Sequence, residues 1–581
     1  MVTSALRQLD TRLHRDRSVV PTSWHVRIAL IAAIACGAYM TSVALRLAGP
    51  TVHPDEWGFL TNGQALLGHA EAPIPTGSFY PAGYGVVTGL GAAITGSLHG
   101  AYRFSLLTNV VLAIVTAWYA GRVATRGFGA SALMGHVVTA LVFVMPGTIV
   151  TAMFAWPETA SRLMFLIFIS FVMNVAKQRT MWRVLGLGLF TGLMPALHGR
   201  FTLLVGVVCL LFAWWGFTSA VPRRIAALAI VVTIGGYEIS HVLNKLVKDR
   251  LYAESFDQES RLLKRLFDPS VWPALLRTMV GQTWYLTATS FGLVGVGVVY
   301  AIHRVRSDGA IRTVSTDSQR LGLLVLLSSS FLVVFTGGLQ LLYGARGDHL
   351  IYGRYVEILV PALVVVACVG IEKSFVLAQR AWVLTGIFVA VVTIGYVVID
   401  GGDAVRRGFN RNNIVFPNII GTDALQYLVT PGMISFGSVF VVATLVLWTI
   451  SRRHGSWSVV VLTVALALGS AYSGSHSILT RTGDLVAATK TVSLVKDSGT
   501  HLVGFDMGVV NDRSYYYLRY KLHPIQIVRF DISGPDAIIS SSYNCLYGTP
   551  DKPPTDGEWA VVADEVVLQR VLFQRVGTTH C

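Results

Sequence analysis

The sequence predicts a mainly α-helical protein: a polytopic membrane helix bundle of about 13 transmembrane helices, followed by a small extracytoplasmic α/β domain. Composition is the first observation, since 53% of the 581 residues are hydrophobic and only 13% are charged, against about 25% charged residues in a soluble domain. The second is a succession of apolar runs that approach the ~20 residues needed to cross a bilayer. The third is a C-terminal stretch without such runs. Together they exclude a disordered chain, a fibrous protein and a disulfide scaffold.

Thirteen apolar runs are the expected spans. They cover residues 28–48, 104–121, 131–152, 163–176, 184–197, 201–217, 225–243, 284–303, 321–343, 356–371, 381–400, 432–450 and 457–473. A further run, 82–98, is rich in glycine and small residues. We expect it to be a re-entrant or juxtamembrane helix on the outer side. The alternative is that this run crosses the membrane completely, in which case one of the other 13 runs does not.

Basic residues set the expected orientation, because short cytoplasmic loops are enriched in Lys and Arg. The segment 1–27 carries Arg7, Arg12, Arg15, Arg17 and Arg27, so we place it in the cytoplasm. The membrane domain, 28–473, then has outer loops at 49–103, 244–283, 344–355 and 401–431, in a multi-pass plasma (inner) membrane protein. The net charge of +15 is explained by this orientation, so the lipid bilayer, and not nucleic acid, is the expected partner.

The segment 474–581 is expected to fold outside the membrane. Short strands are predicted at 501–507, 525–531, 537–541 and 559–564, with a helix at 515–521, because Gly, Pro, Asp and Asn punctuate alternating apolar segments there. Cys545 and Cys581 both lie in this segment, on the oxidising side of the membrane, which predicts a disulfide between them. The alternative is a pair of free thiols.

The sharpest candidate for chemistry follows the first span, in the sequence His53-Pro54-Asp55-Glu56-Trp57. A carboxylate held close to lipid can serve as a general base. The competing interpretation is local: Asp55 as an N-cap and Glu56 as a first-turn acid would both favour the start of a helix. The local pattern leaves both uses of the two acids open.

Two groups of cationic residues lie in other predicted outer loops. Arg suits bidentate phosphate binding, and His can donate to the same oxygens. The candidates are therefore Arg346, His349 and Arg354, with Tyr352 in the same segment, and His198 and Arg200. An interfacial aromatic belt and snorkelling arginines are the competing explanations. Further candidates at the outer ends of spans are Glu158, Gln282, Trp284 and Tyr285. Their convergence on one membrane face suits a lipid-phosphate substrate.

These residues resemble the GT-C superfamily of polytopic glycosyltransferases that use polyprenyl-phosphate sugars. The motifs that carry the resemblance, spread in order over nearly the whole chain, are Asp55-Glu56, Tyr80-Pro81-Ala82-Gly83, Arg103, Pro157-Glu158 and Arg354-Tyr355 followed by Pro361. The architecture of about 13 spans and a small external C-terminal domain is also similar. The second acid is Glu56, where arabinosyltransferase-like members tend to show a second aspartate, so the sugar stays open.

The resemblance implies an integral-membrane glycosyltransferase that transfers a sugar from a polyprenyl-phosphate donor to a cell-envelope glycan, glycolipid or protein. It implies Asp55 as the general base, with Glu56 as second choice or partner. Donor phosphate contacts are expected from Arg354, His349, Arg346, His198 and Arg200, and supporting contacts from His53, Tyr80, Glu158, Gln282, Trp284, Tyr285 and Tyr352. No metal-ligand spacing and no cofactor motif is found, and the need for a divalent metal stays open. A lipid-linked sugar flippase or transporter, a glycan ligase or polymerase, and a receptor are the alternatives.

Overall fold

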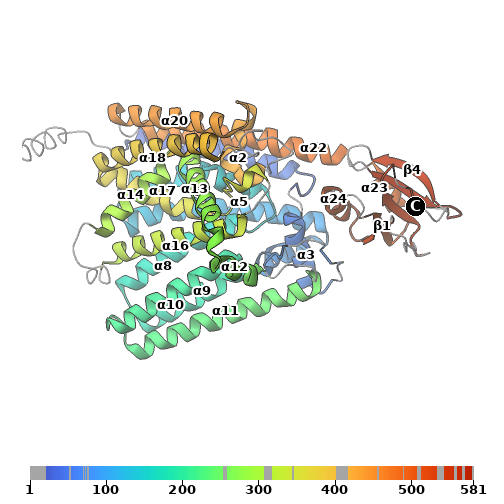
Figure 1. Cartoon of the computed structure of the whole chain (residues 1–581), viewed down its shortest axis with the longest axis horizontal. Helices are drawn as coiled ribbons and strands as arrows, with labels where there is room; N and C mark the ends of the chain where they lie inside the picture. The colour runs from blue at the N-terminus through green and yellow to red at the C-terminus, as the bar shows by residue number, and fades with distance from the viewer. Residues whose placement is uncertain are drawn as a thin grey trace, which may run out of the picture.

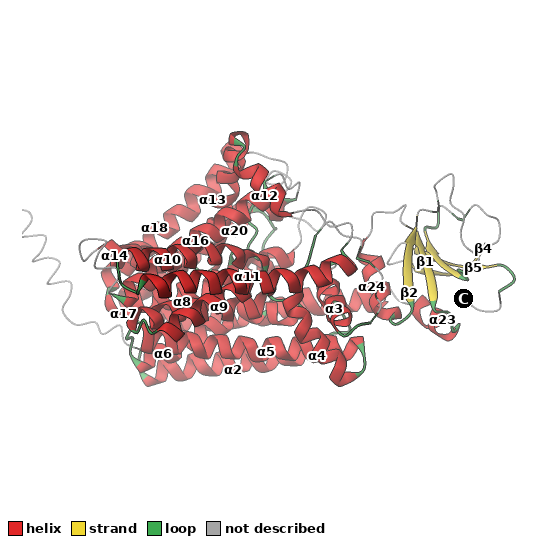
Figure 2. Ribbon diagram, turned by 90° about the horizontal axis from the view of Figure 1, so that it is seen from below, coloured by secondary structure: helices red, strands yellow, loops and turns green. Residues whose placement is uncertain are grey.

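The structure is a computed structural model, and it divides into a long helical bundle and a small sheet domain at one end of it (Figures 1 and 2). It describes residues 21–51, 54–69, 71, 73–74, 78–252, 258–306, 317–342, 346–400, 416–454, 457–487, 490–506, 512–530, 532, 542–551, 553–554, 559–565, 570–578 and 581. His53 and the strand expected at 537–541 therefore lie outside the described residues.

The helical bundle accounts for most of the chain. Its helices are α2 (Ser23–Arg46), α3 (Asp55–Leu66), α4 (Gly85–Thr95), α5 (Leu98–Arg122), α6 (Ala132–Val144), α7 (Pro146–Ile149), α8 (Glu158–Lys177), α9 (Met181–Leu193), α10 (Thr202–Phe217), α11 (Arg223–Leu251), α12 (Gln258–Leu266), α13 (Trp272–Thr289), α14 (Leu293–Arg306), α16 (Ser318–Leu341), α17 (Val360–Lys373), α18 (Phe375–Gly395), α20 (Met433–His454), α21 (Trp457–Ser473) and α22 (Thr480–Ala487). The prediction of a mainly α-helical bundle is confirmed.

The expected number of 13 spans is not confirmed. Within the described ranges, nine helices are long and apolar enough to cross a membrane, and the number rises to 11 if each of two bent helix pairs is one span. One pair bends by 62° at Pro146, where proline removes a backbone donor. The other bends by 108° between α13 and α14, where Phe291 and Gly292 have positive φ. The remaining two expected spans correspond to α9 and α17, with 13 and 14 residues, which reach only about 20 Å.

The glycine-rich run at 82–98 forms the short helical segment Ala82–Thr95, whose length of about 21 Å is less than the ~30 Å hydrocarbon core of a bilayer. Its small residues let it pack closely on α3: a Cβ on Gly63 would lie 2.5 Å from the backbone nitrogen of Gly89. Gly96, with φ of 65°, ends the helix. The glycine content of this run is thus explained by helix packing beside the start of α5.

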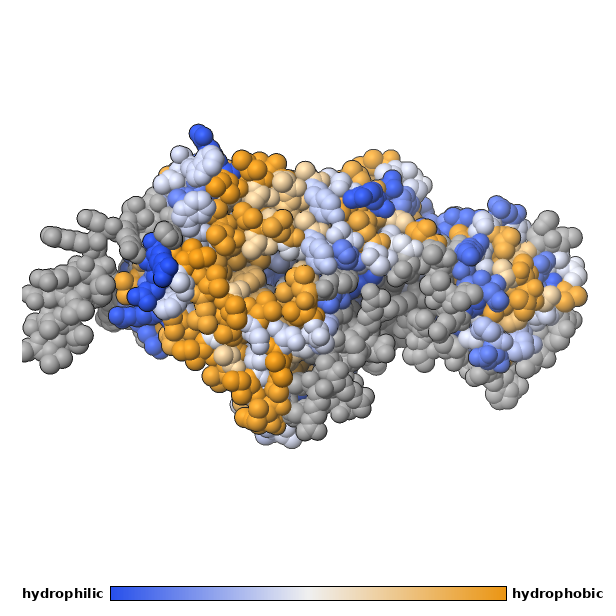
Figure 3. All heavy atoms as spheres, turned by 90° about the horizontal axis from the view of Figure 1, so that it is seen from above, coloured by the Kyte–Doolittle hydropathy of each residue, from blue (hydrophilic) through white to orange (hydrophobic). Residues whose placement is uncertain are grey.

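Large apolar side chains cover the outside of the long helices (Figure 3). Exposed fractions reach 69% at Ile34, 74% at Leu210 and 61% at Val391. A water-soluble surface does not carry a continuous apolar cover of this kind, so these faces are suited to contact with lipid.

The C-terminal domain has a five-stranded mixed sheet in the order β2-β1-β3-β5-β4. Its elements are α23 (Thr491–Asp497), β1 (Leu502–Asp506), α24 (Asp512–Leu522), β2 (Gln526–Phe530), β3 (Cys545–Gly548), β4 (Trp559–Glu565) and β5 (Arg570–Arg575). β1 pairs in parallel with β2 and β3, whereas β5 is antiparallel to β3 and β4. The predicted α/β class is confirmed, and β3 and β5 were not anticipated.

The expected disulfide in this domain is absent. Cys545 and Cys581 are both buried free thiols, and they lie in hydrogen-bonding contact with each other. This contact and burial raise the pKa of Cys581. The structure therefore has the pair of free thiols that was the alternative to the disulfide.

Candidate functional site

The two acids after the first span have different environments. α3 begins at Asp55, with Pro54 in the N-cap position, so Asp55 is the first helical residue and not the cap. The side chain of Glu56 is fully buried and accepts backbone hydrogen bonds from Thr51 and Ala155, both at 2.7 Å. The side chain of Asp55 is 21% exposed. Glu56 therefore fixes the backbone, and Asp55 is the acid open to a reactant.

Arg354 joins Asp55 to the start of α8. Its Nη1 donates to Oδ2 of Asp55 and its Nε to Oε1 of Glu158, while its guanidinium lies 4.0 Å from the ring centroid of Trp156. The hydroxyl of Tyr80 donates to the other oxygen of Asp55 at 2.6 Å. Burial alone would lower the pKa of Arg354, but the two carboxylates raise it well above its ordinary value. The cation is thus permanently charged and shared between two acids.

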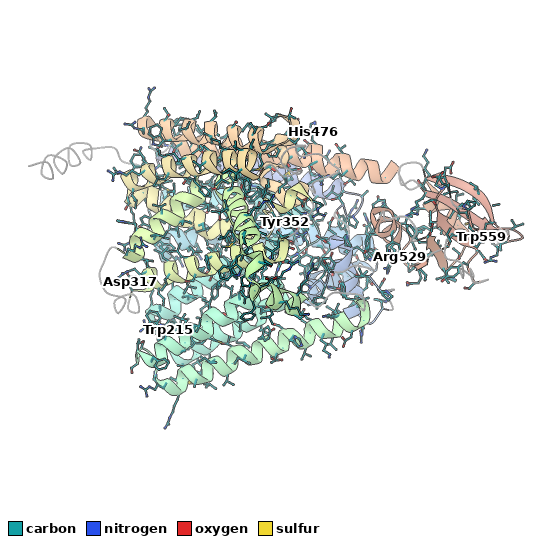
Figure 4. All side chains as sticks on the ribbon, viewed as in Figure 1. Trp215, Asp317, Tyr352, His476, Arg529 and Trp559 are labelled. Atoms are coloured by element: carbon teal, nitrogen blue, oxygen red, sulfur yellow. The ribbon has the colours of Figure 1, made fainter. Side chains whose placement is uncertain are left out.

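A second cation lies beside this cluster. The guanidinium of Arg200 stacks 3.3 Å from the ring centroid of Tyr355, and its Nη1 is 3.1 Å from Nε2 of His198. Desolvation and the charges of Arg200 and Arg354 lower the pKa of His198 well below its ordinary value, so this imidazole is neutral. The rings of Tyr352 and Tyr355 are 4.3 Å apart, and that of His349 is 6.1 Å from Tyr352. Figure 4 shows Tyr352 within the helical part of the molecule.

Two polar atoms of this second group are buried without a hydrogen-bond partner among the described residues: Nε of Arg200 and Nδ1 of His349. Buried polar groups in native proteins are nearly always satisfied. An anionic ligand with acceptor oxygens would supply the missing partner for the guanidinium, which presents its donors in a fixed fork.

Two buried ion pairs join α8 to the facing segment, Glu158 with Arg354 and Arg162 with Glu357. α8 carries Glu158 and Arg162 one turn apart, and the facing segment carries Arg354 and Glu357 in the opposite order. Arg162 Nη2 lies 2.6 Å from Oε2 of Glu357, and the hydroxyl of Tyr285 donates to the other oxygen of Glu357. All four charged side chains are at least nine-tenths buried. Breaking such a pair costs about 3–5 kcal/mol, so this arrangement fixes Arg354 against α8.

Arg346, an expected phosphate ligand, forms an ion pair with a neighbouring acid. It makes a bidentate contact with Asp348, with both N–O distances 3.0 Å, and Asp348 also accepts from Asn418 at 2.8 Å. The carbonyl oxygen of Asn418 accepts from the backbone nitrogens of Gly353 and Arg354, both at 2.9 Å. Arg346 therefore belongs to a network that holds the backbone beneath Arg354.

The group expected on α13 is built into the bundle. Trp284 is fully buried and donates to Thr393 of α18 at 3.0 Å, so its ring is not exposed for contact with a sugar or an acceptor. Gln282 is also fully buried, close to Gly337, and neither amide atom has a partner among the described residues. Tyr285 is the one of the three that reaches the charged residues, through Glu357.

The structure thus brings together most of the predicted site residues: Asp55, Glu56, Tyr80, Glu158, His198, Arg200, Tyr285, His349, Tyr352 and Arg354. The residues missed from the sequence are Arg162, Glu357 and Asn418. The spacing Glu158-x-x-x-Arg162 was the available signal for one of them, since residues four apart share a helix face. In the described part of the chain no three His, Cys, Asp or Glu side chains gather as ligands of a metal would.

Comparison with known proteins identifies the fold. No family description and no curated protein matches the sequence. Among solved structures, ArnT from Cupriavidus metallidurans bound to undecaprenyl phosphate is similar over 95% of this chain and 99% of that chain, with 15% identity and a TM-score of 0.54. The apo state of the same ArnT matches over 94% and 97%, with 15% identity and a TM-score of 0.52. The chain therefore has the ArnT fold.

Proposed function

We propose that this protein is an integral-membrane glycosyltransferase of the GT-C type, which transfers a sugar from a polyprenyl-phosphate donor to a hydroxyl acceptor of the cell envelope at the outer face of the plasma membrane. The observation that carries the proposal is the Asp55 carboxylate, part-exposed between Tyr80 and Arg354, beside a second cation with an unsatisfied donor. The similarity to ArnT supports it, because one of the matching ArnT structures holds undecaprenyl phosphate.

In the proposed reaction Asp55 removes the proton from the acceptor hydroxyl. The acceptor oxygen forms a bond to the anomeric carbon as the bond between that carbon and the phosphate oxygen breaks. The electron pair leaves with the polyprenyl phosphate, and the anomeric configuration is inverted. General-base catalysis of this kind contributes about 100- to 10,000-fold to a rate.

The leaving phosphate gains a negative charge, which requires cations close to it. Arg200 supplies one from beside the Tyr352–Tyr355 pair, with neutral His198 as its neighbour. Arg354 supplies the second, because protonation of Asp55 weakens the ion pair that holds this guanidinium at the base. Glu158 keeps Arg354 in place through the Nε contact while its Nη1 turns toward the phosphate.

The proposal favours transfer over transport of a lipid-linked sugar. A flippase requires cations that bind phosphate, but its activity does not require a general base. Asp55 lies beside Arg354 and is part-exposed, as a base that accepts a proton from a hydroxyl must be. The two ion pairs of α8 also fix the segment that carries Arg354 against this helix, which suits a site that holds its substrate in one position.

The test uses the full chain purified into lipid nanodiscs. A panel of radiolabelled polyprenyl-phosphate sugars is supplied with cell-envelope glycolipid and glycan acceptors, and products are identified by mass spectrometry. Sugar transfer with release of polyprenyl phosphate is the expected result. Donor that crosses the bilayer of proteoliposomes intact, with no transfer to any acceptor, would contradict the proposal and favour the flippase.

A further inference from the structure

The C-terminal domain contacts the segment that carries Asp55 through one helix. α24 lies between the sheet and α3 in both ribbon views (Figures 1 and 2). It connects β1 to β2, and the ring of Tyr515 in α24 packs on Phe505 of β1, with the two centroids 5.2 Å apart. Its last turns, with the sequence Tyr517-Leu-Arg519-Tyr520-Lys521-Leu, face the membrane domain.

The first set of contacts is made where the chain enters α3. Nζ of Lys521 donates to the carbonyl oxygen of Ala48 at 3.1 Å. The ring of Tyr520 lies so close to Gly49 that a Cβ there would be 2.5 Å from it, and the Tyr520 hydroxyl is 2.7 Å from Nδ1 of His99 at the start of α5. These contacts fix the end of α2 against α24.

The second set is made where the chain leaves α3. Arg519 is 3% exposed, and its Nη2 lies 3.6 Å from Oε2 of Glu71, whose side chain is equally buried. Nη1 of Arg519 donates to the carbonyl oxygen of Pro73 at 3.2 Å. Nε2 of His523 is 3.2 Å from the other oxygen of Glu71. The two oxygens of this buried acid are therefore directed at Arg519 of α24 and at His523, the residue that follows the helix.

Arg519 also contacts α3 itself. Its guanidinium lies 5.0 Å from the ring centroid of Trp57, two residues after Asp55, and Trp57 is 1% exposed. The guanidinium thus connects the first turn of α3 to the segment after it. Removing a charge from water costs free energy, so a buried arginine must keep its partners. Because Arg519 belongs to the C-terminal domain and its partners Glu71 and Trp57 to the membrane domain, it restricts how the two domains can be placed.

We propose that Arg519 is a positioning residue for the transfer reaction, through which the C-terminal domain sets the place of Asp55. This inference rests on the proposed function of Asp55. α24 contacts the chain both before α3, at Ala48 and Gly49, and after it, at Glu71 and Pro73. These contacts fix the first turn of α3, where Asp55 contacts Tyr80 and Arg354. Arg519 does not touch substrate.

The expected effect follows from the sensitivity of catalysis to geometry, in which a displacement of about 1 Å can lower a rate by about 100-fold. We expect Arg519→Met to lower kcat by about 10- to 100-fold, with KM for the donor changed less than about threefold, because the phosphate ligands lie on other segments. Arg519→Lys retains the charge toward Glu71 and should recover part of kcat. Arg575→Met is the matched control, since Arg575 also stacks on a tryptophan and donates to a carbonyl oxygen, but within the sheet domain.

The experiment measures kcat, KM and hydrogen exchange of residues 55–66 for these variants of the full chain in nanodiscs. Faster exchange of α3 in Arg519→Met, together with the selective loss of kcat, supports the proposal. Unchanged exchange and unchanged kcat in Arg519→Met, or an equal loss of kcat in Arg575→Met, would overturn it.

Exchange separates this inference from the proposed function. If Asp55→Asn retained full activity, the proposed base would be wrong, and exchange in Arg519→Met would still report whether α24 holds α3. If Arg519→Met gave too little folded protein, Arg519→Lys and Glu71→Gln would be measured instead, and wild-type exchange and kcat in both would overturn the inference.

Discussion

Replacing Asp55 with Asn removes the proposed base while keeping the size of the side chain. The remaining carbonyl oxygen can still accept from Tyr80, which now donates to Oδ1 at 2.6 Å, but the amide cannot take a proton from an acceptor hydroxyl. A general base contributes about 100- to 10,000-fold, which corresponds to about 3–5 kcal/mol of barrier at 1.36 kcal/mol per tenfold. We expect transfer to fall by that factor.

The same variant should remain folded. Asp55 is 21% exposed, and Arg354 keeps its contact with Glu158 when Asp55 is changed. The loss of one charge-assisted hydrogen bond costs about 1.5–3 kcal/mol, less than the stability of an ordinary domain. Donor binding should persist, because the phosphate contacts assigned to Arg200 are untouched.

Glu56→Gln is the matched control, because it makes the same chemical change one residue later. Glu56 accepts the backbone N–H groups of Thr51 and Ala155, and a glutamine can accept through only one of its two terminal atoms. We expect the free energy of unfolding to fall by about 1–3 kcal/mol, with kcat of the folded protein within about tenfold of wild type.

The assay is single-turnover transfer with preloaded donor, read by mass spectrometry, alongside thermal unfolding of each variant and donor titration. A folded Asp55→Asn protein with a transfer rate within about tenfold of wild type would refute the assignment of the base. Equal losses of kcat in the two variants would also refute the division of roles between the neighbouring acids.

Three further predictions concern the surrounding charges. Arg354→Met leaves Glu158 buried without its cation, so the free energy of unfolding should fall by about 3–5 kcal/mol, and adding Glu158→Gln should restore part of it; a double variant as unstable as Arg354→Met would contradict the pairing. Arg200→Met should lower kcat/KM for the donor by about 10- to 100-fold, from the loss of a charge-assisted hydrogen bond worth about 1.5–3 kcal/mol, and a donor titration that leaves affinity unchanged would count against it. The pKa of His198 is lowered from 6.5 in the folded protein, so the unfolded chain binds the proton first and this residue lowers stability as pH falls below 6.5; unfolding temperatures from pH 5 to 8 should vary less in His198→Gln, and identical profiles would contradict the prediction.

Several local features of the site were predictable because they depend on short stretches of sequence. Asp55 was singled out from an acidic pair that directly follows a span, and Arg354 from an arginine before a predicted late span; the structure brings the two side chains into contact. Trp284 shows the limit of such patterns, because a tryptophan at the end of an apolar run has the same signature whether it faces the interface or, as here, donates to Thr393 inside the bundle.

The pairing of distant charges could not be predicted in this way. Arg354 and Glu158 are 196 residues apart, and Arg162 and Glu357 are 195 apart. Their contact depends on how α8 packs against the segment before α17, which the hydropathy of either segment does not encode. The two short helices α9 and α17 show a related limit: an apolar run indicates burial, but its hydropathy alone does not show how long the helix within it will be.

The charges at the site acquire a common explanation under the proposed reaction. Asp55, Glu158, Arg354 and Arg200 sum to zero, and His198 is held neutral. As the acceptor loses its proton, one negative charge disappears from Asp55 and another appears on the leaving phosphate, so the charge moves within the site without leaving it. Arg354 is bound to Asp55 by one nitrogen and to Glu158 by another. In the proposed reaction, protonation of Asp55 therefore frees Nη1 of Arg354 as negative charge develops on the phosphate. Glu158 keeps its contact with Nε and holds the rest of the guanidinium in place.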